Sequence, residues 1–153
     1  METSLKIYTD GGCQGNPGPG GWAYVMVQGD TILAEQFGGE KAATNNRMEL
    51  TAVIESLKKL KTLQGDPEVP RQAAICTDSQ YVQKGITEWI RRWKINNWRT
   101  ADKKPVKNQD LWMELDTIAV EFPLKWEWVP GHSGVEYNER CDKMTQEAIA
   151  SMK

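Results

Sequence analysis

Hydrophobic and polar residues alternate near the N-terminus, and alternation with a period of two is typical of β-strands. The pattern is clearest in Leu5–Thr9, where every second side chain is apolar or β-branched. Two further segments, Trp22–Gln28 and Thr31–Phe37, are rich in the aromatic and branched residues that favour strands. Only Gly29 and Asp30 separate these two segments, so a β-hairpin is predicted. Successive strands of this kind predict an antiparallel meander.

The segment 11–21, GGCQGNPGPGG, is expected to interrupt regular structure, because glycine and proline favour turns. It is not a phosphate-binding P-loop, because no Lys-Ser or Lys-Thr pair follows its glycines. A dinucleotide-binding fingerprint is also excluded, since the segment leads into a strand and not into a helix. Two interpretations remain: a tight turn between strands, or a turn whose backbone amides approach a nucleic-acid phosphate or ribose.

A helix is predicted after the meander, because apolar residues recur there at helical spacing. These residues are Leu50, Val53, Leu57 and Leu60. Good N-cap residues precede them, namely Thr44, Asn45 and Asn46. The turn-forming residues Gly65, Asp66 and Pro67 are expected to end the helix.

The second half of the chain alternates between strand and helix patterns. The predicted elements are a short buried strand at Ala73–Thr77, a helix capped by Ser79 that runs to about Trp89, a helix opened by Asn108, a strand at Leu124–Val129 and a helix at Val135–Met152. The pattern between Trp89 and Lys107 does not define how many helices it contains. Helical crossovers between the later strands predict an α/β fold, with a five-stranded mixed sheet flanked by helices.

A length of 153 residues predicts a single domain, 1-153. The longest apolar runs are too short to span a bilayer, and the first residues, METSLK, do not resemble a signal peptide. The three cysteines are Cys13, Cys76 and Cys141; their odd number and spacing favour free thiols in a reducing cytoplasm. A zinc site is not expected, because the only histidine, His132, lies in no paired-ligand spacing.

Charge is unevenly distributed, although the formal net charge is only −2. The segment Lys84–Lys107 holds eight basic residues and two acidic ones, interleaved with tryptophans. This composition is typical of a nucleic-acid surface, although Trp89 and Trp93, four residues apart, could equally pack in a core. The residues expected to contact nucleic acid here are Trp89, Arg91, Arg92, Lys94, Arg99, Lys103, Lys104, Lys107 and Trp112.

Four acidic residues are the candidates for chemistry: Asp10, Glu49, Asp78 and Asp142. Asp10 and Asp78 each follow a Thr at the end of a predicted strand, and parallel strands would bring both to one edge of a sheet. Gathered carboxylates repel one another, and a cluster of oxygen ligands suits Mg²⁺ or Mn²⁺. Taken singly, each could be a solvated surface charge or, for Asp78, a helix cap. His132, in a loop near Asp142, is a candidate for proton transfer.

The motifs that carry these residues resemble those of bacterial type 1 ribonucleases H. They are YTDGGCQGNPGPGGW, ATNNRMEL, TDSQYV, GITEWI, TADKKPVKNQDLW and KWEWVPGHSGVEYNERCD, which span nearly the whole chain. The resemblance implies a ribonuclease H-like fold and an enzyme that cuts the RNA strand of an RNA–DNA hybrid with little sequence preference. The products would carry a 5′-phosphate and a 3′-hydroxyl.

The resemblance also implies roles for individual residues. Asp10, Glu49, Asp78 and Asp142 would hold one or two Mg²⁺ ions, with Mn²⁺ as a possible substitute, and His132 would assist proton transfer or product departure. Contacts with the hybrid would come from Asn16, Asn45, Asn46 and Gln80, and Thr44 would help to grip a phosphate of the DNA strand. The segment Trp89–Lys107 resembles a basic protrusion that holds the hybrid. A cytoplasmic monomer without an obligate protein partner or membrane contact is expected.

Other functions share this fold class. Integrases and resolvases use similar carboxylates on DNA, and a hybrid-binding module or a domain of a reverse transcriptase is also conceivable. A non-catalytic module is expected to lack a carboxylate, yet all four are present. One departure concerns affinity: Ile95 and Asn96 stand where known relatives carry basic residues, which predicts weaker or more salt-sensitive hybrid binding.

Overall fold

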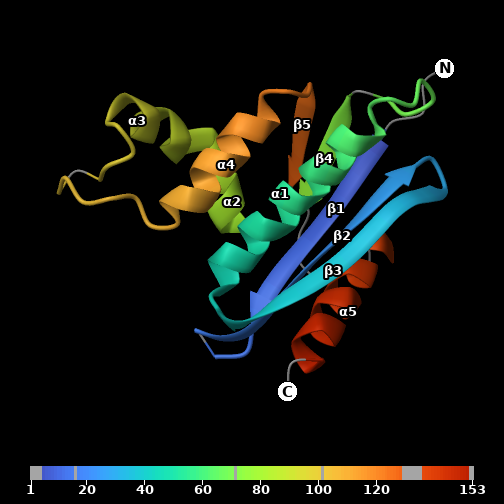
Figure 1. Cartoon of the computed structure of the whole chain (residues 1–153), viewed down its shortest axis with the longest axis horizontal. Coiled ribbons are helices and arrows are strands. Elements are labelled where there is room, and N and C mark those ends of the chain that lie inside the picture. Colours follow the sequence, from blue (N-terminus) through green and yellow to red (C-terminus); the bar gives the residue numbers. More distant parts are fainter. Residues whose placement is uncertain (1–4, 16, 71, 101, 129–135, 152–153) are drawn as a thin grey trace.

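The fold is built on one five-stranded mixed sheet in the strand order β3-β2-β1-β4-β5 (Figure 1). The computed structural model describes residues 5–15, 17–70, 72–100, 102–128 and 136–151. The strands are β1 (Leu5–Cys13), β2 (Gly18–Gln28), β3 (Thr31–Ala43), β4 (Ala73–Thr77) and β5 (Leu124–Trp128). β1, β2 and β3 pair antiparallel, whereas β4 joins β1 and β5 joins β4 in parallel. The predicted mixed sheet is therefore confirmed.

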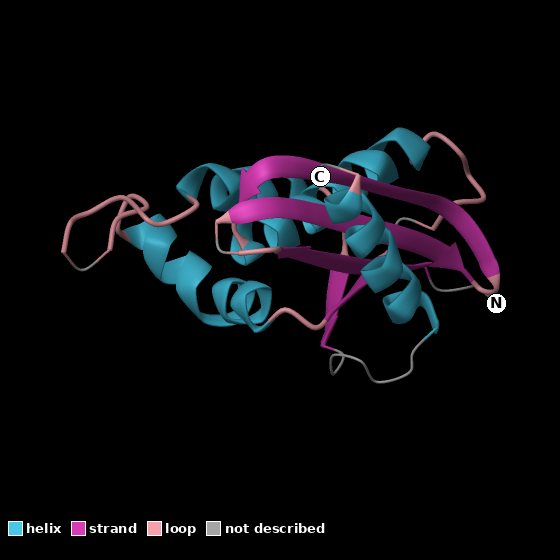
Figure 2. Cartoon of the chain, turned by 90° about the horizontal axis from the view of Figure 1, so that it is seen from below, coloured by secondary structure: helices cyan, strands magenta, loops and turns pink. Residues whose placement is uncertain are grey.

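Helices cover both faces of the sheet (Figures 1 and 2). They are α1 (Asn45–Leu63), α2 (Gln80–Lys84), the π-helical turn η1 (Gly85–Trp89), α3 (Ile90–Ile95), α4 (Gln109–Ala119) and α5 (Glu136–Ala150). α1 and α4 pack together on one face, while α5 packs against β1, β2 and β3 on the other. None of these helices, within the described ranges, is long and apolar enough to cross a membrane.

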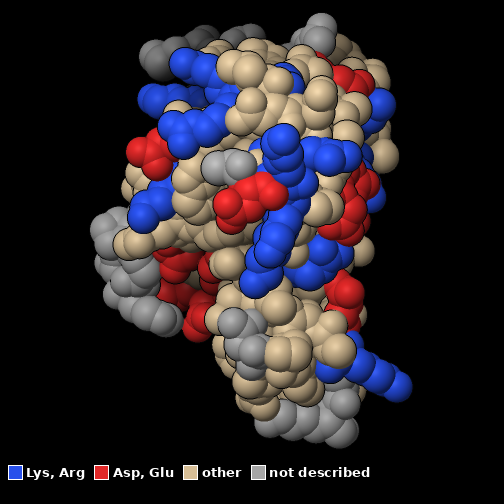
Figure 3. All heavy atoms as spheres, turned by 90° about the vertical axis from the view of Figure 1, so that its left-hand side faces the viewer, with Lys and Arg blue, Asp and Glu red and all other residues tan. Residues whose placement is uncertain are grey.

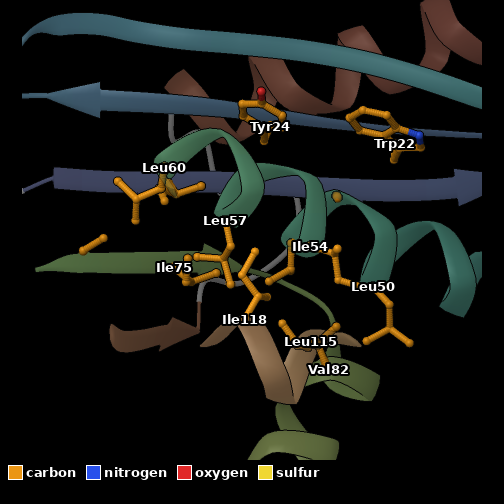
Figure 4. Packing of buried hydrophobic residues seen from close by; sticks show 14 of the residues in the cluster. Trp22, Tyr24, Leu50, Ile54, Leu57, Leu60, Ile75, Val82, Leu115 and Ile118 are labelled. Carbon is orange, nitrogen blue, oxygen red and sulfur yellow. The ribbon is translucent and has the colours of Figure 1, made fainter. Parts of the chain in front are cut away.

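The main core lies between α1, α4 and the sheet (Figure 4). The apolar stripe predicted for the first helix is confirmed, because Leu50, Val53, Leu57 and Leu60 are all fully buried. Figure 4 shows Leu50, Leu57 and Leu60 on the side of α1 that faces β4 and the residues contributed by α2 and α4. Those residues are Val82, Leu115 and Ile118.

The glycine-rich segment differs from the expectation that it interrupts regular structure. β1 continues to Cys13 and β2 begins at Gly18, so that most of this segment is paired strand with only a tight turn at its tip. A hydrogen bond from Gln14 N to Pro19 O, 2.9 Å long, closes the turn, as the tight-turn interpretation predicted. The prediction failed because a strand needs only backbone partners, and glycine supplies these as well as any residue.

Small residues are required here because helices press on both faces of the strands. A Cβ atom on Gly11 would lie 2.4 Å from the backbone carbon of Met48 in α1. A Cβ atom on Gly21 would lie 2.7 Å from the carbonyl oxygen of Thr145 in α5. The glycines therefore allow close packing of α1 and α5, a use that turn propensity does not reveal.

The remaining helix boundaries largely match the prediction. Thr44 caps α1 through its side chain, Ser79 caps α2, and Asn108 precedes α4. The helix predicted from Ser79 to about Trp89 is divided into α2 and the π-helical turn η1. The region between Trp89 and Lys107 becomes α3, followed by a loop in which Trp98 N donates to Trp93 O and Val106 N donates to Trp98 O. The predicted strand end at Val129 and helix ends at 135 and 152 lie outside the described residues.

An aromatic cluster joins the protrusion, residues 89–107, to the rest of the fold. Trp93 packs between Trp89, Trp98 and Trp112, with ring centroids 5.4 to 6.2 Å apart. Trp112 is fully buried, and its indole nitrogen donates to the Tyr81 hydroxyl over 2.8 Å. The prediction that Trp112 contacts nucleic acid is therefore wrong, because its ring forms the base of this cluster. Trp89 remains partly exposed.

Replacing Gly85 by alanine should strongly destabilise the protein. A Cβ atom there would lie 1.9 Å from the buried Trp112 ring, whose displacement should cost about 1–3 kcal/mol through overpacking. Urea denaturation would measure the loss. Gly65→Ala is the matched control, since nothing lies within 4 Å of a Cβ atom at that position. Equal stabilities of the two variants would contradict this account of the packing.

Candidate active site

The four candidate carboxylates come from four different elements that meet at one edge of the sheet. Asp10 lies inside β1, Glu49 on α1, Asp78 directly after β4 and Asp142 on α5. In the parallel pair β1–β4, Tyr8 lies opposite Cys76, so the chain reaches Asp10 and Asp78 two residues further along both strands. Asp10 interacts electrostatically with the other three carboxylates. The expectation that Asp10 ends its strand is wrong, but the parallel alignment still brings it to Asp78.

Close backbone packing determines the position of Glu49. Because Gly11 has no side chain, the backbone at Met48 and Glu49 lies directly on β1, beside Asp10. Asn45 reinforces this contact, since its side-chain oxygen accepts a hydrogen bond of 2.8 Å from the Cys13 amide. The first turn of α1 is thus tied to the end of β1.

Ser79 positions the Glu49 carboxylate from the other side. Its buried hydroxyl donates to Glu49 Oε2 and accepts a hydrogen bond of 3.1 Å from the Val82 amide. One side chain therefore caps α2 and orients an acidic residue on α1. The sequence predicted only the capping role. The position of Ser79 next to Asp78 in the sequence was the signal from which its contact with Glu49 could have been predicted.

Burial and mutual repulsion make this cluster electrostatically unfavourable. Burial raises the pKa of Asp10 from 3.8 to about 7, with further increases from the neighbouring carboxylates. Burial and repulsion from Asp78 raise the pKa of Glu49 from 4.5 to about 7, opposed by the Ser79 hydrogen bond. Figure 3 shows acidic side chains gathered in a recess of the surface. An acidic recess of this kind is stabilised by a bound cation.

The donor chemistry fits a hard divalent cation. All four side chains offer only carboxylate oxygens, which Mg²⁺ and Mn²⁺ prefer. Among the described residues, however, no three His, Cys, Asp or Glu side chains are arranged to hold a metal ion together. A Mg²⁺ site does not need a complete set of protein ligands, because Mg²⁺ characteristically keeps several water ligands.

The residues expected to contact a hybrid surround this cluster in part. Thr44 caps α1, where its hydroxyl accepts a hydrogen bond of 3.3 Å from the Arg47 amide. Asn45 and Asn46 form the first turn of α1, and the exposed Gln80 begins α2. Asn45 and Asn46 lie within about one helical turn of Glu49, and Gln80 lies two residues after Asp78. The predictions for Asn16 and His132 lie outside the described residues.

The basic residues of the protrusion are all exposed. They are Arg91, Arg92, Lys94, Arg99, Lys103, Lys104 and Lys107. Figures 1 and 2 show that α3 and the loop after it extend away from the sheet, and Figure 3 shows basic side chains spread over this end of the molecule. Lys94 forms an ion pair of 3.3 Å with Asp116 on α4, so its charge is partly neutralised.

A polar network that the sequence did not reveal links the first turn of α1 to the base of the protrusion. Arg47 on α1 makes two hydrogen bonds to Asp110, of 2.9 and 3.0 Å, and a third to Asn108 Oδ1. The side-chain nitrogen of Asn108 in turn donates a hydrogen bond to the Tyr81 hydroxyl, which also accepts one from the Trp112 indole nitrogen. Asn108 adopts a left-handed conformation with φ 61°, which suits asparagine better than most residues. The start of α1 is therefore coupled to the aromatic base of the protrusion.

Known proteins are similar to this chain in sequence and in architecture. The model of the ribonuclease H family matches residues 2–150. Ribonuclease H of Treponema denticola is 51% identical, over 97% of this chain and 99% of that protein, and ribonuclease H of Cupriavidus pinatubonensis is 54% identical over 95% of each. Among solved structures, LC11-RNase H1 in complex with an RNA/DNA hybrid is similar, with a TM-score of 0.74, 26% identity and coverage of 97% of this chain and 98% of that one.

The fold and the sequence together define the class of this protein as a nucleic-acid hydrolase with a mixed α/β sheet. The chain belongs to the ribonuclease H family. The family resemblance inferred from the motifs is thereby confirmed.

Asp10→Asn should stabilise the metal-free protein near neutral pH. Because the pKa of Asp10 is raised to about 7, the native state binds a proton that the unfolded state releases near pH 4, and stability falls as the pH rises between these values. The variant should therefore gain on the order of 4 kcal/mol at pH 7 and almost nothing at pH 4. Denaturation in EDTA at both pH values measures this difference.

Asp30→Asn is the matched control for that measurement. Asp30 is exposed in the turn between β2 and β3, so its replacement should leave the pH dependence of stability unchanged. An Asp10→Asn protein no more stable than wild type at pH 7 would contradict the electrostatic account of the cluster.

Proposed function

We propose that the protein hydrolyses the RNA strand of RNA–DNA hybrids through the carboxylate cluster at Asp10, and that the chain acts as one domain. The observation that carries this proposal is the convergence of four carboxylates from β1, α1, β4 and α5 on one edge of the sheet. Membership of the ribonuclease H family supports it, as does the hybrid bound to the related LC11-RNase H1.

Divalent metal is the cofactor that the donor set favours. Asp10, Glu49, Asp78 and Asp142 would hold one or two ions, Mg²⁺ or Mn²⁺. When bound, such ions supply an activated water and stabilise charge on the leaving oxygen. The products would then carry a 5′-phosphate and a 3′-hydroxyl. Ser79 would hold Glu49 in place for this task.

Recognition of the hybrid would use its backbone more than its bases. The polar residues Thr44, Asn45, Asn46 and Gln80 lie at the starts of α1 and α2, close in sequence to Glu49 and Asp78, and would meet phosphates and the 2′-hydroxyl groups that distinguish RNA. The protrusion carries exposed positive charge at one side of this site. Contacts of this kind predict little sequence preference. A cytoplasmic monomer that needs no protein partner is consistent with this role.

Cleavage assays distinguish the candidate functions. End-labelled RNA–DNA hybrid, single-stranded RNA, duplex RNA and duplex DNA would each be incubated with Mg²⁺ or with EDTA. Cleavage confined to the RNA strand of the hybrid, and dependent on metal, is the expected result. Cutting of DNA would instead assign an integrase-like or resolvase-like nuclease, and binding without cleavage would assign a hybrid-binding module.

Asp10→Asn should abolish this cleavage, by at least about 1,000-fold, because a neutral amide cannot replace a charged ligand of the metal. Initial rates on the same hybrid measure the loss, and Asp30→Asn should cleave at the wild-type rate. Near-normal turnover of Asp10→Asn would remove the carboxylate cluster from the mechanism.

Ile95→Lys should tighten hybrid binding and increase its salt dependence. Ile95 is an apolar residue 77% exposed on α3, within an otherwise basic surface, so a lysine there adds one phosphate contact. The slope of log K against log salt should steepen by about 0.9. Val120→Lys is the matched control, because Val120 is similarly apolar and 74% exposed but lies at the end of α4 away from the protrusion. Equal slopes for both variants would show that the position of the charge is unimportant.

A further inference from the structure

Thr145 on α5 is a buried polar residue whose function the proposed mechanism leaves open. It is 1% exposed and lies three residues, close to one helical turn, after Asp142. Both residues therefore lie on the side of α5 that faces the sheet. The buried residues of that side are Asn138, Cys141, Thr145, Ala148 and Ile149.

The alignment of α5 with the sheet places Thr145 over Asp10. Cys141 Sγ lies 3.2 Å from the carbonyl oxygen of Tyr8, to which it donates a weak hydrogen bond. Four residues along the helix from Cys141 to Thr145 cover about 6 Å, and two residues along the strand from Tyr8 to Asp10 cover about 6.6 Å. The next turn of α5 meets Gly21, which pairs with Gly12, two residues beyond Asp10. Helix α5 and strand β1 therefore run side by side and advance by nearly equal distances over these residues.

The Thr145 hydroxyl also differs from the other threonine hydroxyls in the described helices. Those of Thr51, Thr62 and Thr117 donate to a carbonyl oxygen of their own helix, and that of Thr87 in η1 donates to Gln83 O of the preceding α2, at 2.6 to 2.9 Å. Thr145 Oγ1 makes no such bond and has no partner in normal hydrogen-bond geometry among the described residues. The Thr145 hydroxyl therefore does not donate a hydrogen bond to a backbone carbonyl oxygen of α5.

Asp10 is the acceptor within reach of this hydroxyl. Thr145 acts on Asp10 as a hydrogen-bonding side chain and lowers the pKa of its carboxyl, against the effects of burial and of the neighbouring carboxylates. In the structure itself, Thr145 Oγ1 makes no hydrogen bond of normal geometry with a described residue. A hydroxyl hydrogen rotates freely, and an unpaired buried hydroxyl is unfavourable, so a small side-chain rotation would complete the bond.

We propose that Thr145 is a positioning residue of the active site, whose hydroxyl donates a hydrogen bond to Asp10 and orients that carboxylate for Mg²⁺. Among the described residues, the other titratable groups that interact with Asp10 are Glu49 from α1, Asp78 after β4, and Cys141 and Asp142 from α5, all acidic or weakly acidic. Thr145 supplies a neutral donor on this side of the cluster. Hydrogen bonds to metal-ligating carboxylates fix ligand orientation and raise metal affinity.

Three substitutions separate the hydroxyl from the packing of the side chain. Thr145→Val keeps the shape and removes the hydroxyl, whereas Thr145→Ser keeps the hydroxyl and removes a methyl group. Thr117→Val is the control, because the Thr117 hydroxyl is exposed and bonded within α4. Each protein would be titrated with Mg²⁺ alone in a calorimeter, and its melting temperature, kcat and KM for the hybrid would be measured.

Thr145→Val should weaken Mg²⁺ binding about 10-fold and lower kcat at limiting Mg²⁺, with the KM for the hybrid unchanged. Thr145→Ser and Thr117→Val should bind Mg²⁺ as wild type does. Unchanged affinity in Thr145→Val would overturn the proposal, as would an equal loss in Thr145→Ser, which would assign the effect to packing. If Thr145→Val fails to fold, Thr145→Ala and Thr145→Ser, which differ only by the hydroxyl, give the same comparison.

This inference rests on the proposed function, and the experiment separates the two. Wild-type protein that neither binds Mg²⁺ nor cleaves the hybrid would overturn the proposed function itself. A wild-type protein that does both, beside a Thr145→Val variant indistinguishable from it, would overturn only the role of Thr145.

Discussion

Close packing of α1 and α5 against the backbone of β1 and β2 is the constraint on which the rest of the structure depends. α1 lies on Gly11 and α5 lies on Gly21, at distances that leave no space for a Cβ atom. Because the two helices press on opposite faces of the same pair of strands, Glu49 and Asp142 both reach Asp10 from their separate layers. Larger residues at these glycines would move a whole helix and separate the carboxylates.

The protein maintains an acidic cluster that its own fold disfavours. Burial and repulsion raise the pKa values of Asp10 and Glu49 to about 7, and among the described residues the neutral side chains of Ser79 and Thr145 oppose these effects. The basic charge lies elsewhere, on the exposed protrusion. This separation leaves the carboxylates available to a cation and leaves the lysines and arginines available to a polyanion. The buried carboxylates therefore lower the stability of the fold at the site where their uncompensated charge is available to a cation.

Much of the fold could be predicted because its signals are local. The stripe from Leu50 to Leu60 and the caps at Thr44 and Ser79 act within one helix, so the sequence specifies them directly. Trp112 was misjudged because aromatic residues among lysines are typical of both a nucleic-acid surface and a buried cluster. Its burial depends on Tyr81, Trp93 and Gly85, which come from a distant part of the chain.

The sequence by itself determined the order of the elements, the class of the fold and the identities of the four carboxylates. Periodicity and the Thr-Asp strand motifs depend only on neighbouring residues and on the alignment of parallel strands. Only the tertiary structure decided that the glycine-rich segment is paired strand, that Ser79 contacts Glu49 and that Thr145 is buried between α5 and the sheet. Each of these features arises where two elements far apart in the chain meet, and the distance between their backbones is set by packing that local patterns do not encode.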